Sequence, residues 1–217
     1  MKSWREGFLN GVIEFLRWML YVYFKIFHRL ELRGREHLPK SGPVLIAPNH
    51  QTSYDGMLVG LSLPPPIWCV VMAKYFRMPV IGWLLRTFRG IPIEGPRDIA
   101  AYRRILEKLR DGAFVVLFPE GHRTTDGHLK EFQPGAARAA LTAGVPILPV
   151  SLLGGFEAWP RQQPFPRLFR KLVVQYHPMI PCAVPERTQL KARVAEVTEE
   201  LQEVLEPPVE AWVRGER

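Results

Sequence analysis

The sequence predicts an α/β fold built on a mostly parallel central sheet of about seven strands flanked by helices. The first observation behind this prediction is that short apolar runs alternate along the chain with segments of helical periodicity. The second is that two runs, 114–118 and 147–153, are almost continuously apolar, as in strands buried on both faces of a parallel sheet. A chain of 217 residues with 47% hydrophobic and 23% charged residues also has an ordinary globular composition.

The individual elements follow from these patterns. We expect a helical arm over residues 1–29 and one domain over residues 30–217. Predicted strands cover the apolar runs bounded by turn residues, namely 30–33, 43–48, 67–72, 88–93, 113–118, 147–153 and 172–176. Predicted helices cover the periodic segments, namely 54–63, 80–87, 98–109, 135–143 and 185–204. The last helix lies in an acidic tail, so we expect a solvated face there.

The N-terminal arm is apolar but interrupted by charges. Its longest central uncharged stretch, 18–24, is shorter than the roughly 20 residues that a membrane span requires. On a helix, one narrow sector collects its polar side chains: Glu6, Asn10, Glu14, Arg17, Lys25 and His28. A wide apolar face collects Trp4, Phe8, Val12, Phe15, Met19, Val22 and Ile26.

Two interpretations of this arm are open. A helix with an apolar stripe can dock against the core of its own domain. The arc is wider than one such contact needs, and aromatic and basic residues lie together, which favours one helix, or two broken near Gly11, lying in a membrane interface. We therefore predict an amphipathic, membrane-docking element. A second candidate contact is 161–171, where Phe165, Leu168 and Phe169 alternate with four cations, although a proline-stiffened surface loop explains it equally well.

The charge balance predicts an acidic partner. The chain has 29 Lys+Arg against 21 Asp+Glu, a net charge of +8. This field suits nucleic acid, an anionic membrane surface or a phosphorylated substrate. No nucleic-acid recognition motif is recognisable, so we expect no nucleic-acid partner. The two isolated cysteines, Cys69 and Cys182, predict neither a metal site nor a disulfide framework.

Polar residues follow the predicted strand 43–48, at the edge where parallel sheets hold ligands. His50 and Asp55 are separated by four residues across a strand-to-helix turn. Asp55 can accept the Nδ1 proton and leave Nε2 of His50 free to act as a general base. The alternative is that His50 satisfies a buried turn and Asp55 caps the helix. Because the sequence has no G-x-S-x-G, P-loop or H-E-x-x-H motif, we expect His50 to activate a substrate hydroxyl without a covalent intermediate.

A second polar loop follows the strand 113–118 and contains Glu120, Gly121 and Arg123. The guanidinium of Arg123 can hold a phosphate in a bidentate fork. These blocks, 49–55 and 118–123, followed by 145–150, resemble the glycerolipid acyltransferases, and most closely the bacterial 1-acyl-sn-glycerol-3-phosphate acyltransferases. The blocks span about residues 43–153 in the order that the family has them.

The resemblance implies a cofactor-free enzyme on the cytoplasmic face of the cell membrane, peripheral or monotopic. It would transfer an acyl chain from acyl-CoA or acyl carrier protein to the sn-2 hydroxyl of 1-acylglycerol 3-phosphate, giving phosphatidic acid. His50 and Asp55 would be catalytic. The implied substrate-binding residues are Asn49, Glu120, Gly121, Arg123, Arg97 and Arg89, and the implied acyl-tunnel residues are Met57, Leu58, Leu61 and Val71.

The sequence departs from the family pattern in its cations. Glu94 is followed by Gly95 and Pro96 before Arg97 arrives, and Gln133-Pro134 stands where the family commonly has lysine. Other lysophospholipids or glycerol 3-phosphate therefore stay open as acceptors. So do a thioesterase or hydrolase in which His50 activates water, and a noncatalytic lipid-binding module.

Overall fold

The computed structural model describes residues 2–63 and 66–216, without the side chains of residues 2–10, 12 and 13. The predicted arm residues Glu6, Asn10, Trp4, Phe8 and Val12 therefore lie outside the described side chains.

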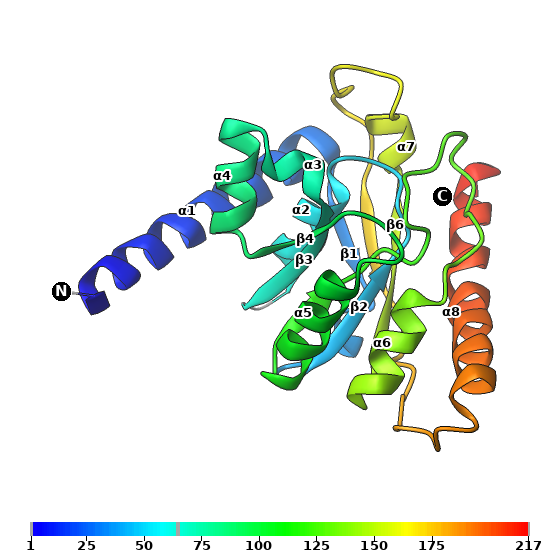
Figure 1. Ribbon diagram of the computed structural model, residues 1–217. Coiled ribbons are helices and arrows are strands. Elements are labelled where there is room, and N and C mark those ends of the chain that lie inside the picture. The colour runs from blue at the N-terminus through cyan, green and yellow to red at the C-terminus, as the bar shows by residue number, and fades with distance from the viewer. Residues whose placement is uncertain (1, 64–65, 217) are drawn as a thin grey trace.

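In the described part of the chain, seven strands form one sheet in the order β1-β7-β6-β2-β5-β3-β4 (Figure 1). Their bounds are β1 Glu31–Arg33, β2 Val44–Pro48, β3 Ile67–Met72, β4 Gly90–Ile93, β5 Phe114–Val116, β6 Ile147–Leu153 and β7 Val173–Tyr176. Neighbouring strands are parallel except β6 and β7, which are antiparallel. The prediction of a mostly parallel sheet of seven strands is confirmed.

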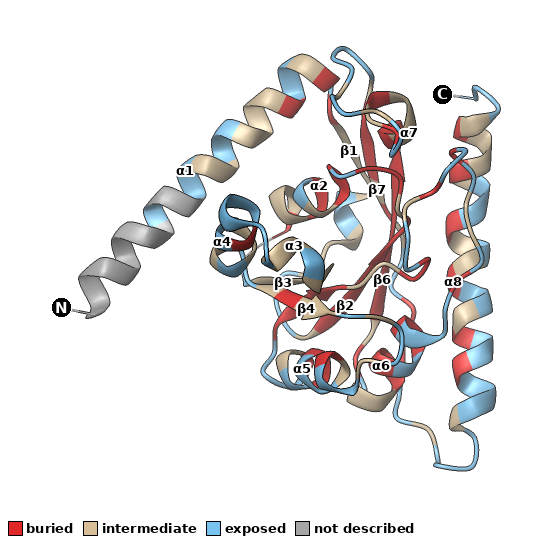
Figure 2. Ribbon diagram, turned by 45° about the horizontal axis from the view of Figure 1, so that its top comes forward, coloured by how far each residue is buried: buried red, intermediate tan, exposed pale blue. Residues whose placement is uncertain are grey.

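Helices cover both faces of the sheet, as Figure 2 shows. Their bounds are α1 Lys2–His28, η1 Arg35–His37, α2 Asp55–Ser62, α3 Ala73–Phe76, α4 Pro79–Thr87, α5 Ile99–Arg110, α6 Gly135–Ala143, α7 Gly155–Ala158 and α8 Leu190–Val213. One core lies between the sheet and α5, α6 and α8, where Leu109, Ala140 and Leu201 are buried. The other lies between the sheet and α1 and α2, where Phe24 and Leu58 are buried.

The C-terminal helix differs most from its prediction. α8 begins at Leu190 and continues through Pro207 and Pro208 to Val213, although we expected it to end before the prolines. Beyond them, Val209 and Trp212 are buried against β6 and β7, and this tertiary packing outweighs the local cost of proline. The single-turn helices α3 and α7 were not predicted, because four residues are too short to show a helical period.

The arm forms one continuous helix through Gly11. Its predicted polar sector is divided: His28 is fully buried and Arg17 donates from Nη2 to the carbonyl of Leu63 at 2.7 Å, whereas Glu14 and Lys25 are exposed. Large apolar side chains are exposed as well, namely Phe15, Trp18, Met19 and Ile26. Phe15, Met19 and Ile26 belong to the predicted apolar face, and its contact with a membrane stays a prediction. Within residues 2–63 and 66–216, no helix combines the length and apolar content that crossing a bilayer requires.

Candidate active site

The strand β2 ends in the middle of the sheet, between β6 and β5, and the turn after it carries the candidate site. Asn49 fixes this turn to the neighbouring strand. Its Nδ2 donates to the carbonyl of Leu152 at 3.0 Å, and its Oδ1 accepts from N of Leu152 at 2.6 Å. Asn49 is buried. Because both ends of its amide bond the backbone of β6, its side chain positions the turn. Its contact with a substrate stays a prediction.

The His50 and Asp55 side chains meet as the sequence predicts. Nδ1 of His50 lies 2.7 Å from Oδ2 of Asp55, which also accepts from N of Gln51 at 2.6 Å and N of Thr52 at 2.8 Å. An oxygen that already accepts two N–H groups acts as an acceptor toward the imidazole, so Nδ1 is the donor. The carboxylate therefore holds the turn and orients the ring at once. It does not cap α2, whose N-cap residue is Tyr54 and which has no side-chain cap hydrogen bond.

The free nitrogen of His50 is accessible. Within the described residues, no protein group bonds Nε2, and the His50 side chain is 22% exposed whereas Asp55 is 0% exposed. The imidazole stacks on Phe118 with ring centroids 4.1 Å apart and an interplanar angle of 23°. Held by Asp55 at one edge and by Phe118 on one face, the ring has a fixed direction, and its unbonded Nε2 is chemically able to accept a proton.

Glu120 links this turn to the second polar loop. Its Oε1 accepts from N of His50 at 2.5 Å and its Oε2 accepts from N of Lys130 at 3.1 Å. Burial raises the pKa of the Glu120 carboxyl to about 7, and the two N–H donors only partly oppose this effect. Since both oxygens accept from backbone N–H groups, Glu120 holds two loops together. Its contact with a substrate stays a prediction. Gly121, in the same turn, has a left-handed φ of 71° that favours glycine.

Two cationic side chains lie beside the histidine turn. Arg123 donates from Nη1 to Oγ of Ser53 at 2.8 Å, and Nζ of Lys130 donates to the carbonyl of Arg123 at 3.0 Å. The carbonyl of His50 accepts from N of Thr124 at 2.8 Å, which closes the two loops on each other. The site therefore combines an oriented base with positive charge, an arrangement suited to an anionic substrate that carries a hydroxyl.

Comparison with known proteins identifies the family. The sequence model of the acyltransferase family matches residues 29–153, more than half of the chain. This chain belongs to the acyltransferase family. The predicted resemblance is thus confirmed, and the matched region contains the whole of both polar loops.

Individual relatives of this acyltransferase carry more specific names. It is 35% identical over 132 residues to the chloroplastic 1-acyl-sn-glycerol-3-phosphate acyltransferase BAT2 of Brassica napus, covering 59% of this chain and 38% of that protein. It is 29% identical over 152 residues to a 1-acyl-sn-glycerol-3-phosphate acyltransferase of Pseudomonas aeruginosa, covering 68% of this chain and 57% of that protein. The alignments thus span less than two thirds of these relatives' own length.

A solved structure has the same fold as this acyltransferase. The crystal structure of the 1-acyl-sn-glycerophosphate (LPA) acyltransferase PlsC from Thermotoga maritima matches with a TM-score of 0.69 at 24% sequence identity. The match covers 92% of this chain and 82% of that one. The similarity therefore extends beyond the family-matched region to most of the sheet and its helices.

The acyltransferase fold does not bring Arg89 to the candidate site. The pairing of neighbouring strands from β4 to β2 places Arg89 at the height of Leu45, which is five residues before His50. In the sheet, β4 lies three strands away from β2. These steps separate Arg89 from His50 by roughly 20 Å. Arg97 follows the carboxyl end of β4, at the same edge of the sheet as His50, and it is exposed. Arg97 is thus the better placed of the two predicted phosphate contacts.

The four predicted acyl-tunnel residues lie in different environments. Leu58 is buried in the core between α2 and the sheet. Met57 is exposed, while Leu61 and Val71 are half-buried. Leu58 therefore contributes to the packing that holds α2, and the other three are the ones that an acyl chain could contact. The tunnel itself stays a prediction.

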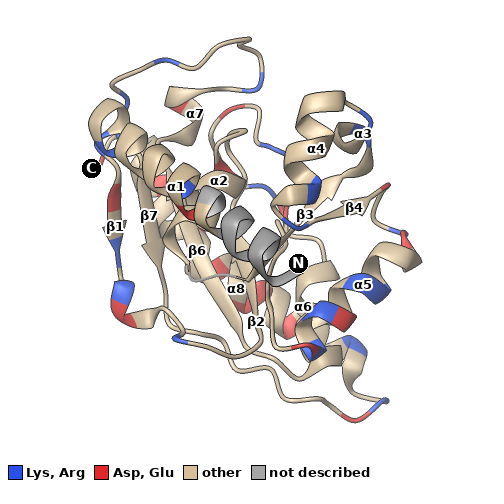
Figure 3. Ribbon diagram, turned by 90° about the vertical axis from the view of Figure 1, so that its left-hand side faces the viewer, with Lys and Arg blue, Asp and Glu red and all other residues tan. Residues whose placement is uncertain are grey.

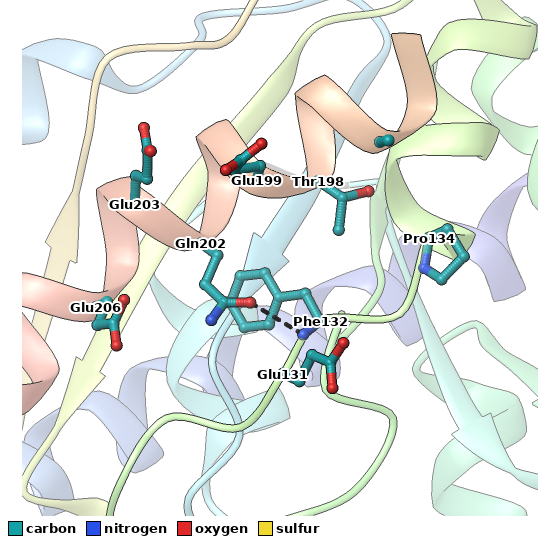
Figure 4. A pocket seen from close by; sticks show the side chains of 9 residues that line it. Glu131, Phe132, Pro134, Thr198, Glu199, Gln202, Glu203 and Glu206 are labelled. Atoms are coloured by element: carbon teal, nitrogen blue, oxygen red, sulfur yellow. Dashed lines mark hydrogen bonds between the residues drawn. The ribbon is translucent and has the colours of Figure 1, made fainter. Parts of the chain in front are cut away.

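A separate hollow lies between the loop after the second polar segment and α8 (Figure 4). N of Phe132 donates to Oε1 of Gln202 at 3.2 Å in its floor. Its acidic side chains are Glu131, Glu199, Glu203 and Glu206. Since these carboxylates would repel a phosphate, this hollow is not an acceptor site for the acyltransferase.

Sequence reasoning missed several residues that shape the site. Gln51 accepts at Oε1 from N of Gly155 at 3.0 Å and so ties the histidine turn to α7. Ser53 accepts from Arg123, which lies 70 residues later, and Lys130 bonds Glu120 and Arg123. Gln51 and Ser53 lie inside the block 49–55 and were accessible from it, but no spacing in the sequence points to Lys130.

Proposed function

We propose that this acyltransferase transfers an acyl chain from a thioester donor to the sn-2 hydroxyl of 1-acylglycerol 3-phosphate, giving phosphatidic acid. The observation that carries this proposal is the His50 imidazole, oriented by Asp55 with Nε2 accessible, beside the cations Arg123 and Lys130. The names of the relatives from Brassica napus and Pseudomonas aeruginosa support the same acceptor.

The proposed reaction needs no covalent enzyme intermediate. Nε2 of His50 takes the proton of the acceptor hydroxyl while the hydroxyl oxygen attacks the thioester carbonyl carbon, so that a C–O bond forms. The tetrahedral intermediate then collapses, the C–S bond breaks, and the proton held by His50 passes to the leaving thiolate. Asp55 stabilises the imidazolium that exists between these two proton transfers.

The phosphate of the acceptor is proposed to bind Arg123 and Lys130. A phosphomonoester is a dianion near neutral pH, and two cations beside the base place its charge next to the reacting hydroxyl. Arg97, three strands away at the same edge, would contact a more distant part of a bound lipid. The acyl donor, acyl-CoA or acyl carrier protein, presents the same thioester in both cases.

Residues 1–29 are proposed to act as a membrane-docking arm and residues 30–217 as the acyltransferase domain. The exposed side chains of Phe15, Trp18 and Ile26 on α1 support this division, because they leave an apolar helix side without a protein partner among the described residues. We propose peripheral or monotopic binding to the cytoplasmic face of the cell membrane, where a net charge of +8 favours anionic lipids.

An acceptor panel tests the proposed function. Purified protein is given acyl-CoA with lysophosphatidate, lysophosphatidylcholine, glycerol 3-phosphate or no acceptor, and free thiol and lipid product are both measured. We expect thiol release that depends on lysophosphatidate and equals the phosphatidic acid formed. Equal thiol release without an acceptor would identify a thioesterase. Preference for another acceptor would replace the proposed substrate. Absence of turnover with both acyl-CoA and acyl carrier protein donors would favour a lipid-binding module.

A further inference from the structure

The crossover between β3 and β4 presents an outward-facing apolar surface. It is formed by residues 73–89, which contain α3 and α4 and which we call the α3–α4 hairpin. Its most exposed large apolar side chains are Met78 at 45%, Val80 at 70%, Ile81 at 39%, Trp83 at 61% and Phe88 at 37%. Figure 2 shows α4 as a largely exposed helix beside the sheet. Apolar side chains gathered on one short element in this way mark an interaction site.

The hairpin holds these side chains outward because its inner side is tightly packed. Gly82 is buried, and a Cβ at this position would lie 2.2 Å from the carbonyl oxygen of Phe76. Nη2 of Arg86 donates to that same carbonyl at 3.0 Å. Because α4 is pinned to the end of α3 along one side, Val80 and Trp83 cannot turn inward without breaking this packing.

The charge of the hairpin favours an anionic partner. Residues 73–89 contain four cations, Lys74, Arg77, Arg86 and Arg89, and no Asp or Glu. Among the side chains that the structure describes, Arg77 is the one of these cations with an ion pair outside the hairpin, at 3.2 Å from Glu94, and both side chains are largely exposed. Exposed Trp with flanking cations on a short helix is the combination that lies in the headgroup region of a bilayer.

We propose that the α3–α4 hairpin is a second membrane contact, which inserts Val80 and Trp83 into an anionic lipid bilayer. The hairpin begins directly after the carboxyl end of β3, the edge of the sheet that carries His50. Figures 1 and 3 place α4 on the same side of the molecule as α1. The inference rests on the proposed function, since two contacts around the His50 edge would hold that edge against the bilayer that contains its lipid acceptor.

Flotation of the full-length protein with vesicles tests the hairpin. The variant Val80→Asn with Trp83→Asn is compared with Val184→Asn, an equally exposed valine at 66% in the segment that leads to α8. On vesicles of phosphatidylcholine with phosphatidylglycerol, we expect the double variant to lose at least about tenfold in partition coefficient and the control to bind as the wild type does. Unchanged binding of the double variant would overturn the proposal.

The cations provide a second measurement. Lys74→Gln with Arg77→Gln should lower binding to the anionic vesicles by roughly thirtyfold and leave binding to pure phosphatidylcholine unchanged. Equal losses on both vesicle types would contradict the charge complementarity. A Val80/Trp83 variant that changes only the sedimentation coefficient would show that this surface binds a second copy of the chain. A variant that changes only turnover with acyl carrier protein donors would show that the surface binds acyl carrier protein. Either result overturns the proposal.

Turnover without a membrane separates this inference from the proposed function. In vesicle-free buffer, with short-chain lysophosphatidate and short-chain acyl-CoA below their aggregation concentrations, the Val80/Trp83 variant should retain wild-type turnover. Loss of turnover there would mean that the hairpin serves the site itself and would overturn the membrane role. A wild-type protein that binds vesicles through the hairpin yet lacks turnover in this buffer would overturn the proposed function alone.

Discussion

Replacing Asp55 by asparagine tests how the His50 ring is held. Oδ2 of Asp55 accepts from Nδ1 of His50, N of Gln51 and N of Thr52. Oδ1 is buried and has no hydrogen-bond partner within the described residues. Asparagine should therefore keep its oxygen at the position with three donors and turn its NH2 toward the unpartnered one. Nδ1 of His50 then stays a donor and the reactive tautomer is preserved.

The expected loss is that of the carboxylate charge. A hydrogen bond to a charged group contributes about 1.5–3 kcal/mol to stability and a neutral one about 0.5–1.5 kcal/mol. The imidazolium of Asp55→Asn is then less stabilised by about 1–2 kcal/mol, so kcat/KM should fall roughly five- to thirtyfold. If the NH2 faced His50 instead, the tautomer would be wrong and the loss would approach 10⁴-fold, on the order seen for a catalytic triad.

The assay is release of free thiol from acyl-CoA in the presence of lysophosphatidate, with urea unfolding as the control for stability. Asp55→Ala serves as the contrast, because it leaves N of Gln51 and N of Thr52 buried without their acceptor. Each unsatisfied group costs about 1–3 kcal/mol, so this variant should lose about 2–6 kcal/mol in unfolding free energy. Wild-type kcat/KM in a folded Asp55→Asn enzyme would refute the role of the carboxylate.

Three further variants test the second polar loop. Burial raises the pKa of Glu120 to about 7, so the protonated carboxyl stabilises the fold fully below pH 4.5, and about 3 kcal/mol of unfolding free energy is lost as pH rises through 7. In urea unfolding, Glu120→Gln should lack this pH dependence. The same dependence of unfolding free energy on pH in the variant would contradict the burial effect. Arg123→Gln should lower kcat/KM for lysophosphatidate about tenfold or more and affect lysophosphatidylcholine less, whereas equal losses would argue against a phosphate contact. Gly121→Ala, at a φ of 71°, should lower the unfolding free energy by about 1 kcal/mol, while Gly135→Ala, with open space and no positive φ, should not.

The sheet was predictable because its strands are short apolar runs with clear boundaries. β3 and β6 occupy the predicted residues, and the others begin or end within two residues of them. The His50 and Asp55 pair was also predictable, since both side chains lie in one local turn. In such cases, neighbouring residues contain the information that fixes the structure.

What sequence could not supply is long-range packing. The end of the arm is held by burial of His28 and by the bond from Arg17 to the carbonyl of Leu63, two contacts that the helical period does not predict. Helix α8 passes two prolines because Trp212 packs against distant strands. Lys130 is held at the site by two bonds, from its backbone N–H to Glu120 and from Nζ to the carbonyl of Arg123. Each of these outcomes depends on contacts that no local pattern encodes.

The measurement that tests the central claim most directly is turnover of His50→Ala with acyl-CoA and lysophosphatidate. The ring has no described partner at Nε2 and is partly exposed, so its removal should leave the protein folded, which circular dichroism checks. The account predicts that acceptor-dependent thiol release and phosphatidic acid formation both fall by at least about 10²-fold, as loss of a general base requires. Unaltered turnover in the folded variant would contradict it.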